Sequence, residues 1–499
     1  MLSLPLPESL KWLVLAISGY IIYSFLYRFV FSPLRHIPGP WYARFSKLWI
    51  IYKTVQGVRA KSIHDLHLKY GPWVVIGPDE VSISDQDAIV PIYGATSKFV
   101  KTTFYTYQLR SIPELFTMSN QKQHADRRRL LAHLFSMSTM KDYEPVISDN
   151  VKLCMDLVAE QGRQGQASNL YDWFHYLSMD IICELSFGRT FNMLREGMNS
   201  TYIQDMYQSL EIEPVRYHFG FLNRYAGWAP LKWVRDSEAA SVRSFKKGVR
   251  MVQEYKQNPE KKRAKDLLRK MLDARDDAGN ALPEDELNIE ATGLILAGSH
   301  TTSSSLTWIV WRLLRHPDIM DRLTKELDDA LSQCPRDAVP LHHHLEHLTY
   351  FNAVIKEGLR IDTAVPGSTP RYVPYGGAEI SGHHLPGGAT VSIQAYSTHR
   401  DPNVFPNPEV FDPDRWLAET PEMRRMYIPF GADGPRKCIG IHLAYVELRV
   451  ILASLLHRFD LSLIEQEDTD RAMDMHELWL AAPEGQKLLV FAKEKPANV

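Results

Sequence analysis

The 499-residue chain contains few cysteines and almost no excess charge. Its four cysteines are widely spaced and form no Cys-x-x-Cys pair, which argues against a disulfide framework and indicates a reducing compartment. A formal net charge of −2 gives no sign of nucleic-acid binding. Internal repeats and a glycine-rich nucleotide loop after a strand are also missing. What the chain does have is 45% apolar residues, enough for one large helical domain or for two to three average ones.

Long apolar runs are scarce, and the clearest one lies near the N-terminus. Residues 12–27 carry no charge, and the run extends to Phe31 if Arg28 snorkels, which gives roughly the 20 residues that a bilayer requires. We predict a single-pass membrane helix over about residues 12–31, within an anchor segment 1–35. A cleaved signal peptide is the alternative, although no small-residue cleavage site follows. The segment 38–40, Pro-Gly-Pro, predicts a stiff hinge after the helix.

The most informative cysteine is Cys438, which lies in the stretch FGADGPRKCIG at residues 430–440. Two basic residues precede it and an amphipathic helical pattern follows it, so local charge and a helix N-terminus both favour a thiolate. Gly434 and Gly440 allow the backbone to approach a flat ligand closely. No second cysteine or histidine stands at zinc spacing, which argues against structural zinc. The pattern suits one metal–thiolate bond, and a buried, inert cysteine in a glycine-rich turn is the alternative.

This stretch resembles the haem-ligand loop of the cytochrome P450 superfamily, in which a cysteine thiolate binds haem iron and promotes cleavage of the oxygen–oxygen bond. The resemblance implies that Cys438 is the axial ligand of haem b. It extends from the proline hinge nearly to the C-terminus, with four ordered motifs at family spacing. One departure is that Phe430 stands eight residues before Cys438 rather than seven, because Asp433 is inserted. The insertion puts the packing of Phe430 against the sulfur in question.

The second motif lies in the longest helical pattern, which begins near Pro283 and ends before Pro317. The resemblance implies that Thr301 is the alcohol that helps to deliver protons during oxygen activation, and that Gly298 thins the helix beside the iron. His300 occupies the position where the family usually has an acid. Because histidine also relays protons, we hypothesise that His300 is part of the proton path. A histidine that is merely hydrogen-bonded in the helix groove is the alternative.

Cationic side chains for the haem propionates are expected at several positions. In the family a Trp-xxx-Arg pair supplies one arginine; here His124 replaces the tryptophan, and Arg128 keeps the arginine. Arginine suits this task because its planar fork binds carboxylates in a bidentate manner. Arg371 and Arg436 match two further propionate ligands, and His399 is a weaker candidate.

A buried charged network and a docking surface are also implied by the resemblance. Glu357 and Arg360 lie three residues apart on one helical face, and Arg415 is expected to join them in a structural triad that supports the haem-ligand loop. A positive surface for an acidic reductase is expected from four basic residues, which are Lys122, Arg127, Arg129 and Lys437.

Together these patterns predict a mainly α-helical cytochrome P450 fold with a small β region, whose haem-thiolate catalytic domain spans residues 36–499. The implied enzyme is a monooxygenase that inserts one oxygen atom of O2 into a small hydrophobic substrate. Its electrons would come from NADPH through a separate NADPH–cytochrome P450 reductase. The implied location is the endoplasmic reticulum membrane, with the catalytic domain facing the cytosol. The sequence as a whole resembles enzymes of fungal secondary metabolism. An isomerase or dehydratase on the same fold and a non-catalytic haem-binding protein are the alternatives.

Overall fold

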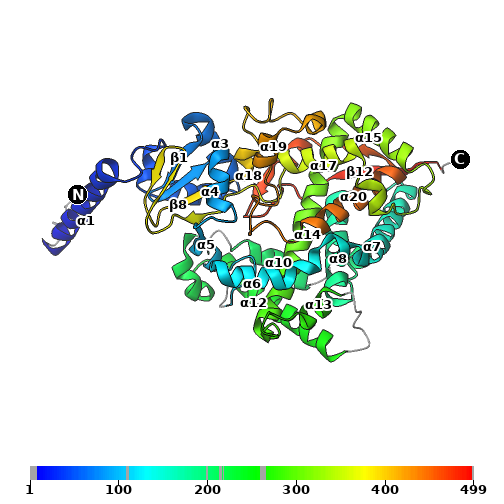
Figure 1. Ribbon diagram of the computed structural model, residues 1–499, viewed down its shortest axis with the longest axis horizontal. Coiled ribbons are helices and arrows are strands. Elements are labelled where there is room, and N and C mark those ends of the chain that lie inside the picture. Colours follow the sequence, from blue (N-terminus) through cyan, green and yellow to red (C-terminus); the bar gives the residue numbers. More distant parts are fainter. Residues whose placement is uncertain are drawn as a thin grey trace, which may run out of the picture.

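The computed structural model describes residues 8–107, 112–197, 201–212, 216, 218–258 and 266–496. Helices dominate this part of the chain, and strands gather mainly in one smaller region that lies next to the helical body (Figure 1). This arrangement agrees with the predicted mainly α-helical fold with a small β region.

The helices are distributed along the whole described chain. They are α1 (Glu8–Leu26), α2 (Leu48–Val55), α3 (Arg59–Tyr70), α4 (Ile89–Tyr93), α5 (Thr103–Tyr107), α6 (Gln121–Ala132), α7 (Met137–Arg163), α8 (Leu170–Phe187), α9 (Met193–Glu196), α10 (Thr201–Leu210), α12 (Lys232–Gln257), α13 (Leu267–Asp273), α14 (Glu284–Arg315), α15 (Pro317–Ala330), α16 (His342–Leu345), α17 (Thr349–Ile361), α18 (Ala395–Thr398), α19 (Pro421–Met426), α20 (Ile441–Arg458) and α21 (Thr469–Ala472).

In the part of the chain that the structure describes, the strands are short and form four sheets. They are β1 (Trp73–Gly77), β2 (Glu80–Ile83), β3 (Val100–Lys101), β4 (Ser168–Asn169), β5 (Arg371–Tyr372), β6 (Ala378–Ile380), β7 (His383–Leu385), β8 (Thr390–Ile393), β9 (Phe459–Leu463), β10 (Met475–Glu477), β11 (Ala481–Pro483) and β12 (Leu489–Glu494). The largest sheet has the order β1-β2-β8-β5-β3, and only β2 and β8 pair in parallel. Its edge pair places Lys101 opposite Arg371, although these residues are far apart in the chain.

Helix α14 is the central element of the helical body. Three acidic residues in its first turn and two arginines in its last turn complement the helix dipole, and Pro317 begins the next helix. Its 32 residues give a length of about 48 Å, enough to cross the domain. It packs most extensively against α8, and this contact fixes which of its faces are covered.

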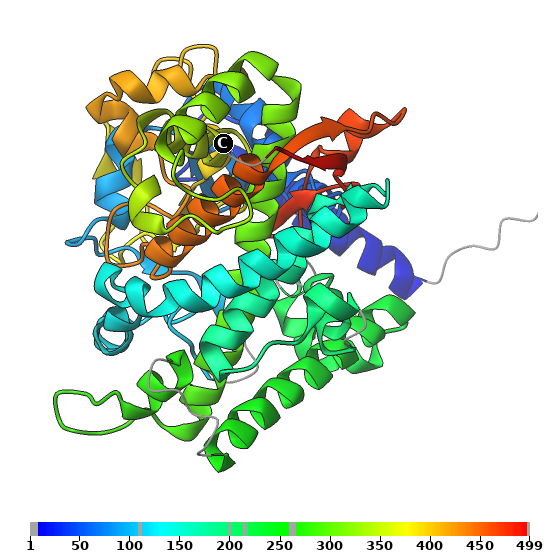
Figure 2. The ribbon, with the colours of Figure 1, turned by 90° about the vertical axis from the view of Figure 1, so that its right-hand side faces the viewer.

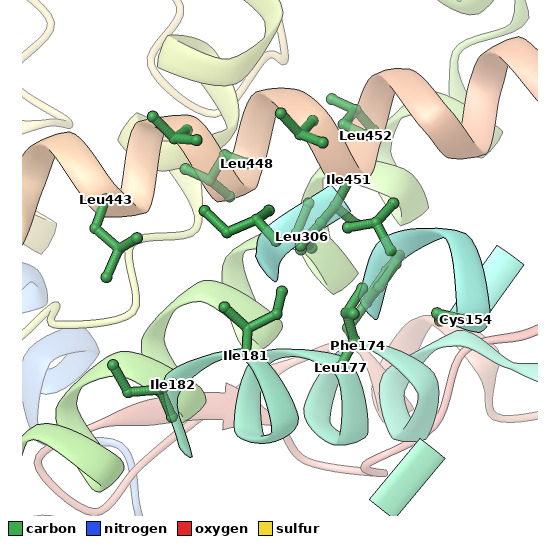
Figure 3. Packing of buried hydrophobic residues seen from close by; sticks show 14 of the residues in the cluster. Cys154, Phe174, Leu177, Ile181, Ile182, Leu306, Leu443, Leu448, Ile451 and Leu452 are labelled. Atoms are coloured by element: carbon green, nitrogen blue, oxygen red, sulfur yellow. The ribbon is translucent and has the colours of Figure 1, made fainter. Parts of the chain in front are cut away.

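The main hydrophobic core lies between α8, α14 and α20. Figure 3 shows Ile181 and Leu177 of α8 facing Leu306 of α14, with Leu448 and Ile451 of α20 on the other side. A second core lies under the five-stranded sheet. The two cores anchor the two regions between which the functional residues lie.

The N-terminal helix α1 projects from the body in both views (Figure 1 and Figure 2) and continues as a π-helix at Tyr27–Phe31. Large apolar side chains along it are exposed, including Trp12 and Tyr20. Among the residues that the structure describes, no helix combines the length and the apolar character needed to cross a membrane.

Candidate functional site

Cys438 lies in the loop that leads into α20. Its backbone N–H donates a hydrogen bond to the Phe430 carbonyl oxygen at 2.9 Å, which closes the loop despite the inserted residue. Asp433 points outward, where it forms an exposed ion pair with Lys437 at 2.6 Å. The Phe430 ring packs against Tyr445 of α20, with ring centroids 5.2 Å apart. The extra residue is therefore accommodated on the outside of the loop.

The glycines of this loop differ in what they contact. A side chain at Gly434 would overlap the Tyr93 carbonyl oxygen, so the close approach there is to the backbone of α4 and not to a flat ligand. At Gly440 the nearest atom to such a side chain is the sulfur of Cys438, at 3.9 Å. Only Gly440 therefore borders the thiol itself, which corrects our expectation for Gly434.

Cys438 is exposed to accessible space, although many protein atoms surround it. Burial in the surrounding protein raises the pKa of the thiol, whereas the Gly440 backbone N–H and the charges of Arg128 and Lys437 act in the opposite direction. The cations that we expected to favour a thiolate are therefore present, but burial outweighs them. Coordination to a metal would supply the remaining stabilisation of the thiolate.

One face of α14 is also accessible in the middle of the helix. Ala297 is exposed and Thr301 partly exposed, whereas Ile295, Ser299 and His300 are buried. The Thr301 hydroxyl donates to the Ala297 carbonyl oxygen at 2.9 Å. Because successive fourth residues lie on one side of a helix, Ala297 and Thr301 belong to a single stripe that faces accessible space.

Gly298 does not lie on this stripe. A methyl group at Gly298 would meet Ile182 of α8 at 2.8 Å, so the glycine permits the close packing of α14 on α8. We expected it to thin the helix beside the iron. The contact that the structure gives it is with α8, although the residue is half-buried and precedes Thr301 by only three positions.

Four predicted cofactor-binding residues lie near one another. Arg436 interacts electrostatically with Arg371 and Arg128, and His124 is affected by all three arginines. Arg128 donates to the Lys437 carbonyl oxygen at 2.7 Å, and Arg436 donates to the Met118 carbonyl oxygen at 2.5 Å. The two arginines thereby hold the loop of Cys438 against α6 and the segment before it.

Lys101 is an additional cation in this group, and our sequence reasoning missed it. It is buried beside Arg371 in the β3–β5 pair, and its ammonium group donates to the Phe116 carbonyl oxygen. It lies 4.5 Å from the centroid of the Tyr105 ring, to whose hydroxyl Arg371 donates at 2.8 Å. Burial and the charges of Arg371 and Arg436 lower the pKa of Lys101 well below its usual value.

These cations form a cluster that comprises Lys101, Arg128, Arg371 and Arg436, together with His124. Within the described residues, no carboxylate lies at ion-pair distance from the four charged groups. Burial and the surrounding charges lower the pKa of His124 to about 3, so it is a neutral hydrogen-bonding group at neutral pH. Lys101 and Arg371 are buried, and Arg128 and Arg436 are half-buried. Cations withdrawn from water without a counterion are costly, and an anionic group bound here would neutralise them. The two propionates of a haem whose iron lies at Cys438 fit this requirement.

His300 lies on the face of α14 that packs against α8. Its Nδ1 is 3.2 Å from Nε2 of His175, a residue that our sequence reasoning also missed. His175 Nδ1 faces the Tyr171 carbonyl oxygen at 3.0 Å. A carbonyl can only accept, so His175 carries its proton on Nδ1 and accepts at Nε2. His300 Nδ1 then donates to His175, and the lone pair of His300 lies on Nε2.

Both histidines are neutral at neutral pH. Burial lowers the pKa of His300 to about 4, and burial together with His300 lowers that of His175 to about 3. The hydroxyl of Ser303 lies 3.1 Å from His175 Nε2. His300 is therefore hydrogen-bonded to α8 through Nδ1, and Nε2 is its second ring nitrogen, which can accept a proton.

Glu357, Arg360 and Arg415 form one hydrogen-bonded network. Arg360 donates from Nε and Nη2 to Glu357 at 2.8 Å each, and Arg415 Nε donates to Glu357 at 3.0 Å. The Trp416 indole N–H and the Asp412 backbone N–H donate to the same carboxylate at 2.9 and 3.0 Å. Neither Glu357 nor Arg360 is exposed at all, so every charge in the centre of this network depends on a partner inside the protein.

Two other expectations need correction. His399 was a weaker propionate candidate, but the Ile428 backbone N–H donates to its Nε2 and its Nδ1 donates to the Arg360 carbonyl oxygen, each at 2.9 Å. Both ring nitrogens are therefore used within the protein. Arg127 was expected on a docking surface, but it is buried and paired with Glu286 and Glu290 of α14.

The other residues of the expected docking surface are accessible. Lys122 and Arg129 are exposed on α6, and Lys437 is about one-third exposed beside Cys438. Arg129 also pairs with Asp126 and Asp277. The basic surface is therefore smaller than the sequence suggested, and two of its members are already partly neutralised by carboxylates.

Two carboxyl groups near α14, the buried Glu447 and the half-buried Glu114, have no counterpart in the sequence-based predictions. Glu447 of α20 is hydrogen-bonded to the Thr302 side chain, and burial raises its pKa to about 8. Glu114 lies in the segment before α6, and burial and the charge of Glu290 raise its pKa to about 8. A single acidic residue in a loop or helix forms no motif that would mark it as functional. Only the fold brings these two residues near α14.

Comparisons with known proteins give a consistent result. The family model described as Cytochrome P450 matches residues 36–490. The chain is 36% identical over 476 residues to the cytochrome P450 monooxygenase tazI of Aspergillus terreus, covering 94% of this chain and 96% of that protein. It is 32% identical over 487 residues to the cytochrome P450 monooxygenase orf2 of Aspergillus niger, covering 96% of both chains. It is also 31% identical over 503 residues to the benzoate 4-monooxygenase bphA of Aspergillus niger, covering 94% of this chain and 95% of that protein.

Proposed function

The chain belongs to the cytochrome P450 family and is a monooxygenase of that family, and from this premise we propose that it inserts one oxygen atom of O2 into a small hydrophobic secondary metabolite. The observation that carries the proposal is the position of Cys438. Cys438 is exposed and lies beside the cationic cluster, in which Lys101 and Arg371 are buried. Among the described residues no carboxylate pairs with the four cations. A haem-thiolate cofactor would satisfy both features at once.

We propose that haem b is bound through Cys438, with Arg128, Arg371, Arg436, His124 and Lys101 as partners of the propionates. When bound, haem would supply the reductive activation of dioxygen that oxygen insertion requires. The protein contributes the sulfur ligand and neutralises the propionate charges. The loop geometry supports this role, because the hydrogen bond from Cys438 N–H to Phe430 fixes the cysteine backbone.

Thr301 and His300 are proposed to guide protons. The Thr301 hydroxyl lies on the accessible stripe of α14 and holds a proton on Oγ1. Nε2 of His300 carries a lone pair, so it can accept a proton and release it again while His175 fixes the ring through Nδ1. His300→Phe should therefore raise the fraction of NADPH and dioxygen consumed without product. Full coupling in that variant would refute the role of His300, and a Thr301→Ala variant measured in parallel reports what loss of the hydroxyl alone does.

We propose that the N-terminal segment 1–35 attaches the protein to the endoplasmic reticulum membrane, with the catalytic domain in the cytosol. The exposed apolar side chains of α1 support this, as do Trp41, Leu48 and Tyr52 in the segment that follows. Phe45 stacks on Phe25 of α1 at 4.1 Å, so the two segments are adjacent. An apolar surface of this kind is typical of membrane contact.

We propose that electrons arrive from NADPH through NADPH–cytochrome P450 reductase. The exposed Lys122 of α6 and the partly exposed Lys437 next to Cys438 support docking of an acidic partner on this side. Charge reversal at Lys122 should slow reduction at low salt and have less effect at high salt, because salt screens exposed charges.

The experiment that tests the proposed function is turnover with isotope-labelled dioxygen. The full-length holoprotein, a reductase and NADPH are incubated with a panel of hydrophobic secondary metabolites, and products are analysed by mass spectrometry. Incorporation of one labelled oxygen atom per product, dependent on NADPH, is expected. Conversion that needs neither NADPH nor dioxygen would instead identify an isomerase or dehydratase, and failure to take up haem would refute the cofactor assignment.

A further inference from the structure

Glu114 occupies an unusual position for a carboxyl group. It lies in the segment between α5 and α6, is half-buried, and packs directly over Gly293 of α14. Gly293 precedes Ala297 by four residues and Thr301 by eight, so all three lie along the same side of the helix. The carboxyl group of Glu114 therefore belongs to the wall that includes the accessible stripe of α14.

The segment that carries Glu114 is fixed at several points. The Leu115 backbone N–H donates to Glu290 of α14 at 2.8 Å, and the Glu114 backbone N–H donates to the Thr117 hydroxyl at 3.0 Å. At its other end, Arg436 of the haem-ligand loop holds the carbonyl oxygens of Met118 and Ser119, at 2.5 and 3.3 Å. The segment thus bridges α14 and the loop of Cys438, and Glu114 is held in place by its neighbours.

The side chain of Glu114 has no partner of its own. Within the described residues it makes no side-chain hydrogen bond and no ion pair, whereas the adjacent Glu290 is paired with Arg127 at 2.6 Å. Because the carboxyl group is only half-buried and has no hydrogen bond within the described protein, it can bond to a molecule in the accessible space beside α14. Burial and the negative charge of Glu290 raise the pKa of Glu114 to about 8, and the Lys101 charge acts in the opposite direction. At neutral pH the group is therefore mainly an acid with an O–H to donate.

We propose that Glu114 is a specificity-determining residue whose carboxyl group donates a hydrogen bond to an oxygen acceptor, such as a carbonyl, of the bound substrate. This inference rests on the proposed function, because it concerns the substrate of the same site. It assigns a class of substrate, which is a hydrophobic molecule with an oxygen acceptor placed toward the segment before α6. A substrate whose nearest polar group is an ammonium would need the ionised carboxylate instead.

Two variants separate these possibilities. Glu114→Gln keeps the shape and a hydrogen-bond donor but removes the acidic group, whereas Glu114→Leu removes all hydrogen bonding. Gly293→Ala tests the position of Glu114 without replacing it. The added methyl group would overlap the Glu114 carboxyl oxygen and displace the side chain. The overlapped atom is the end of a flexible side chain, so the helix itself is expected to fold.

The test is equilibrium dialysis of the holoenzymes against three probes of similar shape, which are 2-acetylnaphthalene, 2-isopropylnaphthalene and 1-(2-naphthyl)ethylamine. The natural protein should bind the ketone about tenfold more tightly than the hydrocarbon. Glu114→Gln should keep this preference, and both Glu114→Leu and Gly293→Ala should lose it. Each variant must also give the reduced carbonyl spectrum of a haem-thiolate protein, so that a failure here is distinguished from failure of the cofactor assignment.

Three results would overturn the proposal. One is that the natural protein does not distinguish the ketone from the hydrocarbon, including the case in which it binds neither. Another is that it prefers the amine and that Glu114→Gln abolishes this preference, which would identify a carboxylate site for a cation. The third is that Glu114→Leu and Gly293→Ala keep the preference for the ketone.

Discussion

Replacing Glu357 by glutamine is the substitution whose effect on stability the structure defines best. The carboxylate accepts five hydrogen bonds, two from Arg360 and one each from Arg415, the Trp416 indole and the Asp412 backbone. Glutamine has nearly the same shape, but its NH2 group would face donors where an acceptor is needed. Arg360, which is fully buried, would keep its charge without a counterion. Breaking one partner of such a buried pair costs about 3–5 kcal/mol.

The matched control is Arg322→Gln, which removes an ion pair to Asp414 in the same region. Both side chains of that pair are about half exposed. An exposed pair of this kind contributes about 0–1 kcal/mol. Comparing the two variants therefore separates the effect of removing an exposed ion pair on stability from the effect of removing a buried one.

The assay is urea unfolding of the holoproteins, followed by far-UV circular dichroism, with unfolding rates measured at a fixed urea concentration. Rates are included because a chain of this length with a bound cofactor does not guarantee a two-state equilibrium. A loss of 3–5 kcal/mol corresponds to unfolding that is faster by a factor between about 10² and about 5 × 10³ if the network breaks before the transition state. Glu357→Gln should thus shift the midpoint strongly and Arg322→Gln only slightly. Equal midpoints and rates for the two variants would refute the reasoning.

Three further predictions follow from the buried titratable and charged groups. Because burial raises the pKa of Glu447 to about 8, the folded protein keeps a proton that the unfolded chain has released. The free energy of unfolding should therefore fall by up to about 1.4 kcal/mol per pH unit as pH rises from about 4.5 to 8. Glu447→Gln should reduce this slope in urea titrations, and Glu465→Gln on the surface should not. Burial lowers the pKa of His175 to about 3. Below about pH 6.5 the unfolded chain therefore binds a proton at this histidine, whereas the folded protein does not, and the free energy of unfolding falls. His175→Phe should lose less stability between pH 6.5 and 4 than the natural protein does. Arg371→Gln should release haem to a protein acceptor faster than the natural protein, because one charge of the cationic cluster is lost; an unchanged release rate would exclude Arg371 as a propionate partner.

The fold could be predicted where residues in the sequence mark the start and the end of a helix. The limits of α14 were clear because Pro283 and the acids of the first turn begin it and Pro317 follows it. In contrast, α7 contains Pro145 in its interior, a residue that normally breaks a helix, so no sequence rule would have predicted 27 continuous residues there. Packing of its apolar face against α8 and α20 outweighs the local preference.

The site could be predicted only where residues stand in short motifs. Cys438 and Arg436 share one loop, and Glu357 and Arg360 share one helix turn, so their proximity follows from the sequence. Lys101 and His175 reach the site through strand pairing and helix packing with residues more than 100 positions away, which a single sequence does not encode in any local pattern. The contact of Gly298 with α8 was missed for a similar reason. A glycine in a helix indicates a close approach, but only the neighbouring α8 determines on which side.

The central claim is that Cys438 is the thiolate ligand of a haem whose propionates are held by the cationic cluster. Its most direct test is the absorption spectrum of the reduced carbonyl complex, recorded for the natural protein and for Cys438→Ser. The account predicts the long-wavelength band of a thiolate-ligated haem in the natural protein and its complete loss in the variant. A natural protein that binds no haem, or a variant that keeps the thiolate band, would contradict it.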